Sequence, residues 1–220
     1  GCAIAYELSN NGYTNIVVIE RNQTIPGLNQ SSTNEGSIHS GIYYPKDVMP
    51  LKAKLCVEGN NLLYEFMQKY NLPYKKVGKL IVALNSRQEE YLDFFLKIGV
   101  ENGVSGIKKI TTRQAKRMEP NIGNVTAALY IPSCGCGSTD ALINKIKDLA
   151  QSNGVTFFLG TKVVGIDPYK ESFLIFTETK SGVRNFKTDL LINSAGLCSD
   201  EIAKMINPEF PYEIDPVRGE

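Results

Sequence analysis

The only histidine of the chain, His39, lies in the segment SSTNEGSIHSGIYY (residues 31–44). Small and polar residues dominate this segment, and neither a helix nor a half-buried strand favours such a composition. An imidazole, with an ordinary pKa of about 6.5, can accept and return a proton near neutral pH. His39 is therefore the candidate for proton-transfer chemistry; the alternative is a histidine that only ties the loop to nearby backbone.

Gly1 and Glu20 have the spacing of a nucleotide-binding unit. In dinucleotide-binding folds the last glycine of G-x-G-x-x-G opens the first helix, whose amides face a pyrophosphate. An acidic residue about 20 positions later, at the end of the second strand, binds the ribose. Glu20 ends the apolar run IVVIE (16–20), so Gly1 and Glu20 fit these two roles. A solvated carboxylate at a strand end is the alternative.

A second glycine-containing edge is expected in DLLINSAG (189–196), an apolar run that reads as a buried strand ending in Ala195 and Gly196. A small residue and a glycine allow a cofactor to approach the backbone at the carboxyl edge of a parallel sheet. The alternative is a glycine required only by a strand-to-helix turn.

Hydroxyl, amide and backbone N–H donors are concentrated around His39. Such donors can form a nest that binds phosphate without adding charge, although an ordinary surface loop has the same composition. The set comprises Ser31, Ser32, Asn34, Gly36, Ser37, Ser40 and Gly41.

Composition excludes several classes of function. The 220 residues have a net charge of +1 with scattered charges, so no nucleic-acid partner is indicated. No run approaches the roughly 18 apolar residues of a membrane span, and the first residues lack the features of a secretory signal. Five cysteines, an odd number, favour free thiols in a reducing compartment. One histidine and the Cys134-x-Cys136 spacing predict no metal site.

The elements that must position these residues alternate between helices and strands. The helix over 51–70 is expected to pack through Leu55, Leu62, Leu63 and Phe66. Ser86 is expected to cap the next helix along the chain, with Glu89 three residues later. Gly12 is the expected end of the first helix. Further helices are predicted near 112–118, over 139–153 and over 197–206. Strands are predicted over 16–19, 74–84, 126–132, 155–160, 161–168, 172–179, 182–188 and 189–196. A long loop is predicted over 22–50 and a turn at 133–138.

This alternation is typical of α/β proteins. The predicted fold is a Rossmann-like nucleotide-binding domain with a parallel sheet, an antiparallel β-meander at about 161–187, and part of an inserted α+β domain.

The run NEGSIHSGIYYPKDVMPLKAKLCVEG, followed by YKKVGKLIVAL, resembles the L-2-hydroxyglutarate dehydrogenase/oxidase family of FAD-dependent, D-amino-acid-oxidase-like flavoproteins. The resemblance extends over essentially the whole chain, through INSAGLCSD to PVRGE. The Asn-x-Gly and His-Ser-Gly part is also similar to flavin-dependent glycerol-3-phosphate dehydrogenases, so it supports the cofactor more strongly than the substrate. The residues that carry the family pattern are Asn34, Gly36, Ile38, His39, 41–44, 51–53, 55–56 and 78–83.

The resemblance implies FAD as cofactor. Val163 falls where related flavoproteins hold the adenine through backbone groups. The cofactor-binding residues predicted in this way are Gly1, Glu20, Arg21, Ser31, Ser32, Asn34, Gly36, Ser37, Val163, Ala195 and Gly196.

The implied reaction is oxidation of a 2-hydroxy acid, L-2-hydroxyglutarate, to 2-oxoglutarate by hydride transfer to the flavin. We hypothesise that His39 is either the catalytic base or a hydrogen-bond partner of the flavin; a covalent flavin link through His39 is a third interpretation. Tyr43, Tyr44 and Arg218 are candidate ligands of the substrate carboxylates, Arg218 because a guanidinium pairs with a carboxylate through two hydrogen bonds.

The chain departs from the family pattern at two places. Cysteine replaces threonine in the longer segment PSCGCGSTD (132–140), and the DVMP link before Leu51 is also longer. If the 132–140 segment contacts substrate, specificity differs from that of the family.

Other functions stay open. A glycerol-3-phosphate dehydrogenase or an amine or amino-acid oxidase would use the same scaffold, and a truncated nucleotide-binding module is the non-enzymatic alternative. The expected partners are a hydroxy dicarboxylate substrate and a quinone or oxygen as electron acceptor. The expected location is the cytoplasm or, peripherally, the inner face of an energy-transducing membrane, which is mitochondrial in a eukaryote.

The expected domains are two parts of the FAD-binding domain (1–71 and 136–206), part of the substrate domain (72–135) and a return to it (207–220). The chain begins without a methionine and is expected to be a piece that lacks both ends, including the first strand with two fingerprint glycines. Such a piece is expected not to bind FAD stably alone.

Overall fold

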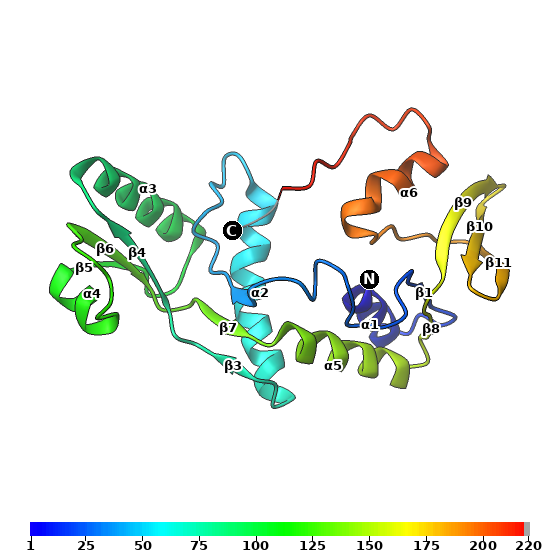
Figure 1. The fold of residues 1–220 in the computed structure, drawn as a ribbon, viewed down its shortest axis with the longest axis horizontal. Coiled ribbons are helices and arrows are strands. Elements are labelled where there is room, and N and C mark those ends of the chain that lie inside the picture. Colours follow the sequence, from blue (N-terminus) through cyan, green and yellow to red (C-terminus); the bar gives the residue numbers. More distant parts are fainter. Residues whose placement is uncertain (218–220) are drawn as a thin grey trace. The chain divides into compact units, whose positions relative to one another are not determined.

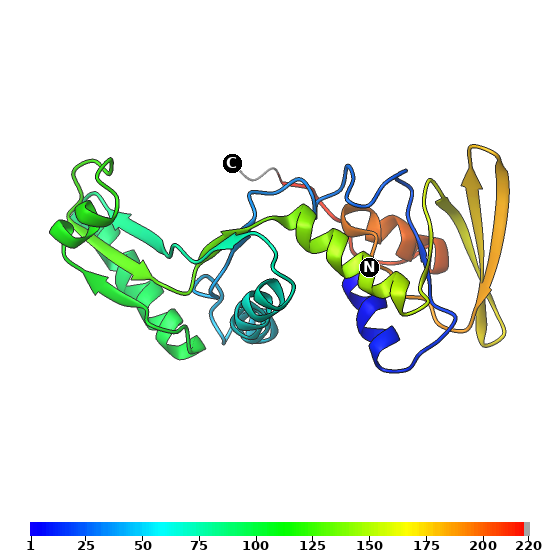
Figure 2. The same cartoon turned by 90° about the horizontal axis from the view of Figure 1, so that it is seen from below.

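The structure, a computed structural model, describes residues 1–217 (Figures 1 and 2). It contains two compact units, one formed by residues 1–34 together with those from Thr139 onward, the other by residues 35–138. Each unit has its own sheets and its own buried core. This division by compactness does not test the functional domain boundaries, which stay predictions.

The first unit contains a small parallel sheet beside two packed helices. Strand β1 (Val17–Ile19) pairs in parallel with β8 (Thr156–Phe158), which confirms the predicted parallel sheet. Helix α1 (Cys2–Asn10) packs along α5 (Thr139–Ser152), as Figure 1 shows. The sequence predicts both helices, and their small buried residues Ala5 and Ala150 form one core with Val155.

The predicted meander is also present in this unit. Strands β9 (Lys162–Tyr169), β10 (Ser172–Thr179) and β11 (Gly182–Thr188) form an antiparallel sheet with β10 in the middle. A 3-10 turn, η1 (Gly196–Cys198), leads into α6 (Ser199–Ile206), which packs beside β9.

The strand predicted over 189–196 is wrong for this structure. The segment is irregular up to η1, and Leu190 and Ile192 are exposed. An extended segment becomes a strand only when its N–H and C=O groups find a neighbouring ladder. Within residues 1–217 no strand pairs with this segment, so its apolar pattern alone does not make it a strand.

The second unit is built on an antiparallel sheet with β6 in the middle. Strands β4 (Lys79–Ala83) and β5 (Lys108–Ile110) flank β6 (Ala127–Ile131), and α3 (Ser86–Asn102) and α4 (Thr112–Met118) pack against the sheet. The side chain of Asn85, rather than Ser86, caps α3 by accepting the amide of Gln88, because Asn85 is the last residue with extended backbone.

A second sheet lies beside α2 (Pro50–Lys69). It consists of β2 (Ser37–Ile38), β7 (Gly135–Gly137) and β3 (Tyr74–Lys75), with β7 in the middle. The turn predicted at 133–138 is therefore wrong. The long loop predicted over 22–50 is present, and the two-residue strand β2 interrupts it. A Cβ at Gly135 would lie 2.3 Å from the Tyr64 hydroxyl, so the glycine lets the strand pass close to the helix.

Helix α2 forms as predicted but buries only part of the predicted face. Its buried residues are Ala53, Asn60, Tyr64 and Met67, whereas Leu55 and Leu62 are 54% and 63% exposed. Leu63, by contrast, is partly buried against Tyr64 and Met67, as predicted. The prediction is wrong for Leu55 and Leu62, because one position of the buried face is a carboxamide, which an apolar pattern does not count. In the part of the chain that the structure describes, no helix is both long and apolar enough to cross a membrane.

The core beneath α3 gives a stability prediction. Leu129, in the middle strand β6, is 0% exposed and packs with Ala83, Leu92 and Ile131. Leu129→Ala should lower the free energy of unfolding by roughly 2–5 kcal/mol, because it removes buried methyl groups and leaves a cavity. Urea unfolding measures this. Leu84→Ala, at an exposed site one residue after β4, should change the midpoint little; equal effects of the two variants would contradict the described core.

Candidate functional site

Three segments of the first unit meet where a nucleotide cofactor was predicted. A Cβ on Gly1, at the start of α1, would lie 3.8 Å from the Cβ of Ser194. Arg21 Nη1, one residue beyond Glu20, donates to Cys198 Sγ at 3.3 Å. Burial raises the pKa of the Cys2 thiol, and the nearby Glu20 carboxylate raises it further. The start of α1, the end of β1 and the 194–198 segment therefore lie together.

Glu20 stands at the carboxyl end of β1, as the sequence predicts. Its amide donates to Phe158 O at 2.9 Å, which continues the pairing of β1 with β8. One carboxylate oxygen accepts the amide of Asn22 at 2.8 Å and so fixes the side chain at the turn. A carboxylate held at this edge suits a ligand with hydroxyl donors, such as a ribose.

The polar turn at 29–34 is held by its own side chains. Asn34 Nδ2 donates to Gln30 O at 3.1 Å and to Ser31 O at 2.7 Å, while Asn29 Oδ1 accepts the Ser32 amide. The buried hydroxyl oxygen of Ser32 has no hydrogen-bond partner among the described residues. Buried polar atoms are nearly always paired in native proteins, so this hydroxyl fits contact with a bound group.

Val163 and Gly196 occupy accessible backbone positions in the same unit. Val163 lies in β9, an edge strand of the meander, opposite Thr177. Gly196 has φ +59, and a Cβ there would meet nothing within 4 Å. Ala195 precedes it, with its amide bonded to Asn193 Oδ1. Open backbone at Gly196, the Gly1 helix start and the unpartnered Ser32 hydroxyl together fit an extended nucleotide cofactor such as FAD.

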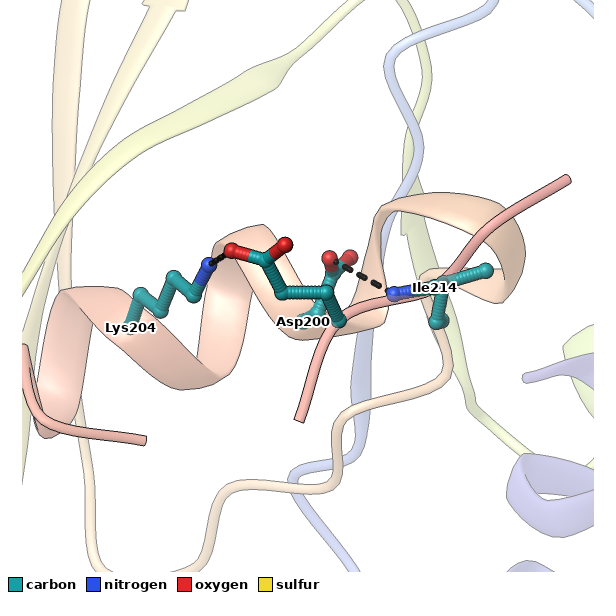
Figure 3. A network of polar contacts seen from close by, with 4 residues as sticks. Asp200, Lys204 and Ile214 are labelled. Carbon is teal, nitrogen blue, oxygen red and sulfur yellow. Dashed lines mark hydrogen bonds and ion pairs between the residues drawn. The ribbon is translucent and has the colours of Figure 1, made fainter. Parts of the chain in front are cut away.

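The segment after α6 is tied back to that helix by a small polar network (Figure 3). Asp200 Oδ2 accepts the amide of Ile214 at 3.1 Å, a hydrogen bond that lowers the pKa of the Asp200 carboxyl. Lys204 Nζ forms an ion pair with Glu213 at 2.7 Å. The predicted substrate ligand Arg218 lies outside the described residues.

His39 lies in the second unit, between buried Ile38 and buried Ser40, and its own side chain is 41% exposed. Partial burial lowers the pKa of its imidazole, and the positive charge of Lys79 lowers it further. Glu35, whose Oε1 lies 3.9 Å from His39 Nε2, acts in the opposite direction. A lowered pKa favours the neutral imidazole, which is the form that can accept a proton.

Lys79 is a candidate that sequence reasoning missed. It begins β4, and its Nζ lies 5.5 Å from the ring centroid of Tyr43. Lys79 is also close enough to His39 for its charge to lower the pKa of the imidazole. Tyr43 also packs edge-on against Phe95, with ring centroids 5.4 Å apart. The only sequence signal for Lys79 was its place in the GKL block of the resemblance.

The remaining predicted residues of this unit support the same loop. Gly36 has φ +69, and a Cβ there would lie 2.5 Å from Gly137 O, so glycine is required at this approach of two strands. Ser37 pairs with Cys136 in the ladder. The Tyr44 ring lies beneath Lys52, whose Nζ is 4.6 Å from the centroid.

The structure thus assembles two partial sites. Gly1, Glu20, Arg21, Ala195 and Gly196 converge in the first unit, where the Ser31, Ser32 and Asn34 turn and Val163 also lie. Gly36, Ser37, His39, Tyr43 and Tyr44 lie in strand β2 and the segments beside it in the second unit. Among residues 1–217 no three His, Cys, Asp or Glu side chains are grouped as metal ligands would be.

Known proteins match this chain over nearly its whole length. It is 35% identical over 206 residues to the L-2-hydroxyglutarate dehydrogenase of Indibacter alkaliphilus, covering 93% of this chain and 50% of that protein. It is 33% identical over 234 residues to the mitochondrial L-2-hydroxyglutarate dehydrogenase of Arabidopsis thaliana, covering 94% of this chain and 47% of that protein. The chain therefore spans about half the length of these relatives.

A solved structure agrees with the sequence relatives. The dithionite-reduced L-α-glycerophosphate oxidase of Mycoplasma pneumoniae with FAD bound has a TM-score of 0.82 and 25% identity, covering 93% of this chain and 53% of that one. The fold is therefore the Rossmann-like fold of FAD-dependent oxidoreductases. A family model described as FAD dependent oxidoreductase (DAO) matches residues 1–220, and the chain belongs to this family.

Proposed function

We propose that the protein carrying this chain oxidises a 2-hydroxy acid, L-2-hydroxyglutarate, to 2-oxoglutarate. The observation that carries the proposal is that Lys79, whose Nζ lies 5.5 Å from the Tyr43 ring centroid, is near His39, an imidazole whose pKa is lowered by partial burial and by the Lys79 charge. A base and a cation are what an α-hydroxy carboxylate requires: one for its hydroxyl proton, the other for a carboxylate. The names of the Indibacter and Arabidopsis relatives support this substrate.

In the proposed mechanism His39 removes the hydroxyl proton of the substrate. Its lowered pKa keeps it ready for that step, and Glu35, 3.9 Å from Nε2, stabilises the imidazolium that forms. Lys79, together with the Tyr43 and Tyr44 hydroxyls and Arg218, would bind and orient the carboxylates. When bound, FAD supplies the acceptor for the electron pair that leaves the substrate carbon.

The cofactor-binding roles are likewise proposals. The helix start at Gly1 would face the pyrophosphate and Glu20, with Arg21 beside it, the ribose. The Val163 backbone would hold the adenine. The loop residues Ser31, Ser32, Asn34, Gly36 and Ser37 and the Ala195–Gly196 backbone would contact the rest of FAD.

The proposal includes a quinone or oxygen as the electron acceptor, and each acceptor implies a different location. A quinone acceptor would require peripheral contact with an energy-transducing membrane, mitochondrial in a eukaryote, whereas oxygen would allow a cytoplasmic enzyme.

Glycerol 3-phosphate is the second candidate substrate. The likeness to the L-α-glycerophosphate oxidase of Mycoplasma pneumoniae favours it, and a cation such as Lys79 suits a phosphate as well as a carboxylate. The motif around His39 does not separate the two.

A substrate panel tests the proposed function. The protein at its full natural length, loaded with FAD, is mixed anaerobically with L-2-hydroxyglutarate, its D enantiomer, glycerol 3-phosphate and an amino acid. We expect L-2-hydroxyglutarate to bleach the flavin absorbance fastest. Faster bleaching by glycerol 3-phosphate would replace the proposed substrate.

Replacement of His39 tests the base. In the same full-length protein, His39→Asn should lower the rate constant of flavin reduction by about 10²–10⁴-fold, because the hydroxyl proton loses its acceptor. Stopped-flow absorbance measures this rate, and an unchanged flavin spectrum before mixing shows that FAD is still bound. A rate equal to that of the natural protein would rule out the base role.

Replacement of Lys79 tests the electrostatics. Since the Lys79 charge lowers the pKa of His39, Lys79→Met should raise that pKa and move the acid limb of the kcat/KM profile to higher pH. KM for the substrate should rise as well. Lys54→Met, on the exposed face of α2, is the matched control and should move neither quantity. If the acid limb of the kcat/KM profile does not move in Lys79→Met, Lys79 does not lower the pKa of the catalytic base.

A further inference from the structure

Helix α2 buries a polar residue where its pattern calls for an apolar one. Asn60 is 5% exposed and lies on the same face as Ala53, Tyr64 and Met67. A carboxamide removed from water costs free energy unless its N–H groups are hydrogen-bonded, so its partners indicate why it is there.

Asn60 donates to two backbone carbonyls that are far apart in sequence. Its Nδ2 lies 2.9 Å from His39 O and 3.0 Å from Ser133 O. The Tyr64 hydroxyl also donates to Ser133 O, at 3.1 Å. In the ladder of β2 and β7, Ser37 pairs with Cys136 and Ile38 pairs with Gly135, so His39 is the first residue beyond the ladder. Asn60 therefore bridges the segment that follows β2 and the segment that precedes β7, at the end of their ladder.

A second carboxamide holds the other end of the same loop. Asn102, the last residue of α3, is 8% exposed, and its Nδ2 lies 2.8 Å from both Gly41 O and Tyr44 O. Between the two carbonyls that Asn102 binds, Ile42 is 1% exposed in the core. At Gly41, with φ +98, a Cβ would lie 2.8 Å from Val57, so the loop also packs closely on α2.

We infer that Asn60 and Asn102 are positioning residues that fix the His39–Tyr44 loop, Asn60 at the His39 end and Asn102 at the tyrosine end. This inference rests on the proposed function of His39 and deepens it. Asn60 binds one loop carbonyl, that of His39, and ties it to Ser133 O. Asn102 binds two loop carbonyls, those of Gly41 and Tyr44, so the loop backbone has little freedom at either end. A catalytic group displaced by about 1 Å can lose on the order of 10²-fold in rate, which is why such anchoring matters.

The inference is tested on Asn60 with a matched control on the same helix. Asn60→Leu removes both donors at similar volume, and Asn61→Leu makes the same change at the neighbouring exposed position. Both variants are made in the full-length protein. The first readout is the NMR signal of the His39 imidazole in protein labelled at histidine, assigned by its loss in His39→Asn.

We expect Asn60→Leu to change the chemical shift of that signal and to move its titration midpoint toward the ordinary histidine value. The freed loop exposes the imidazole to water and separates it from Lys79 and Glu35, the charged groups that face it. The second readout, the rate constant of flavin reduction, should fall by about 10–100-fold at unchanged bound FAD. Asn61→Leu should leave both readouts unchanged.

An imidazole signal and titration that are the same in Asn60→Leu as in the natural protein would overturn the inference. If Asn60→Leu does not fold, Asn60→Ala, which also removes both donors, decides by the same signal. The NMR readout does not depend on catalysis. A shifted signal together with full activity of His39→Asn would thus retain the positioning role and reject the proposed base.

Discussion

Backbone carbonyls that leave a sheet beside an apolar core need hydrogen-bond donors, and in this chain the His39 and Ser133 carbonyls share the donors of Asn60. This constraint decides which face of α2 is buried. It also requires β7 to pass close to the helix, which only glycine permits at Gly135. The loop that carries His39 therefore takes its position from a helix that begins more than ten residues later in the chain.

The charges around that loop complement its fixed backbone. Partial burial lowers the pKa of His39, the charge of Lys79, from β4, lowers it further, and Glu35, four residues before His39, acts in the opposite direction. The imidazole stays neutral, yet an anion lies 3.9 Å away when it takes a proton. Such an arrangement suits a base that is uncharged before the reaction and whose positive charge during the reaction is stabilised by a nearby anion.

Much of the fold is predictable from local pattern. The capping box of Thr111 and Gln114 fixes the start of α4, and apolar alternation with short turns predicts the meander. Elements that depend on distant partners are not predictable in this way: β7 looks like a glycine turn, and 189–196 looks like a strand although nothing in residues 1–217 pairs with it. At the site, His39 stands out as the only histidine. Lys79 is one of 24 Lys and Arg residues, and a buried Asn60 looks like a surface residue until its partners are known.

The central claim is that His39 contacts the reacting hydroxyl from a loop fixed by Asn60. A crystal structure of the full-length protein with FAD and 2-oxoglutarate tests it most directly. We predict a nitrogen of the His39 imidazole within about 2.6–3.2 Å of the 2-oxo oxygen, with the Asn60 hydrogen bond to the His39 carbonyl intact. A bound 2-oxoglutarate whose 2-oxo oxygen is out of reach of His39 and contacts another base would contradict the account.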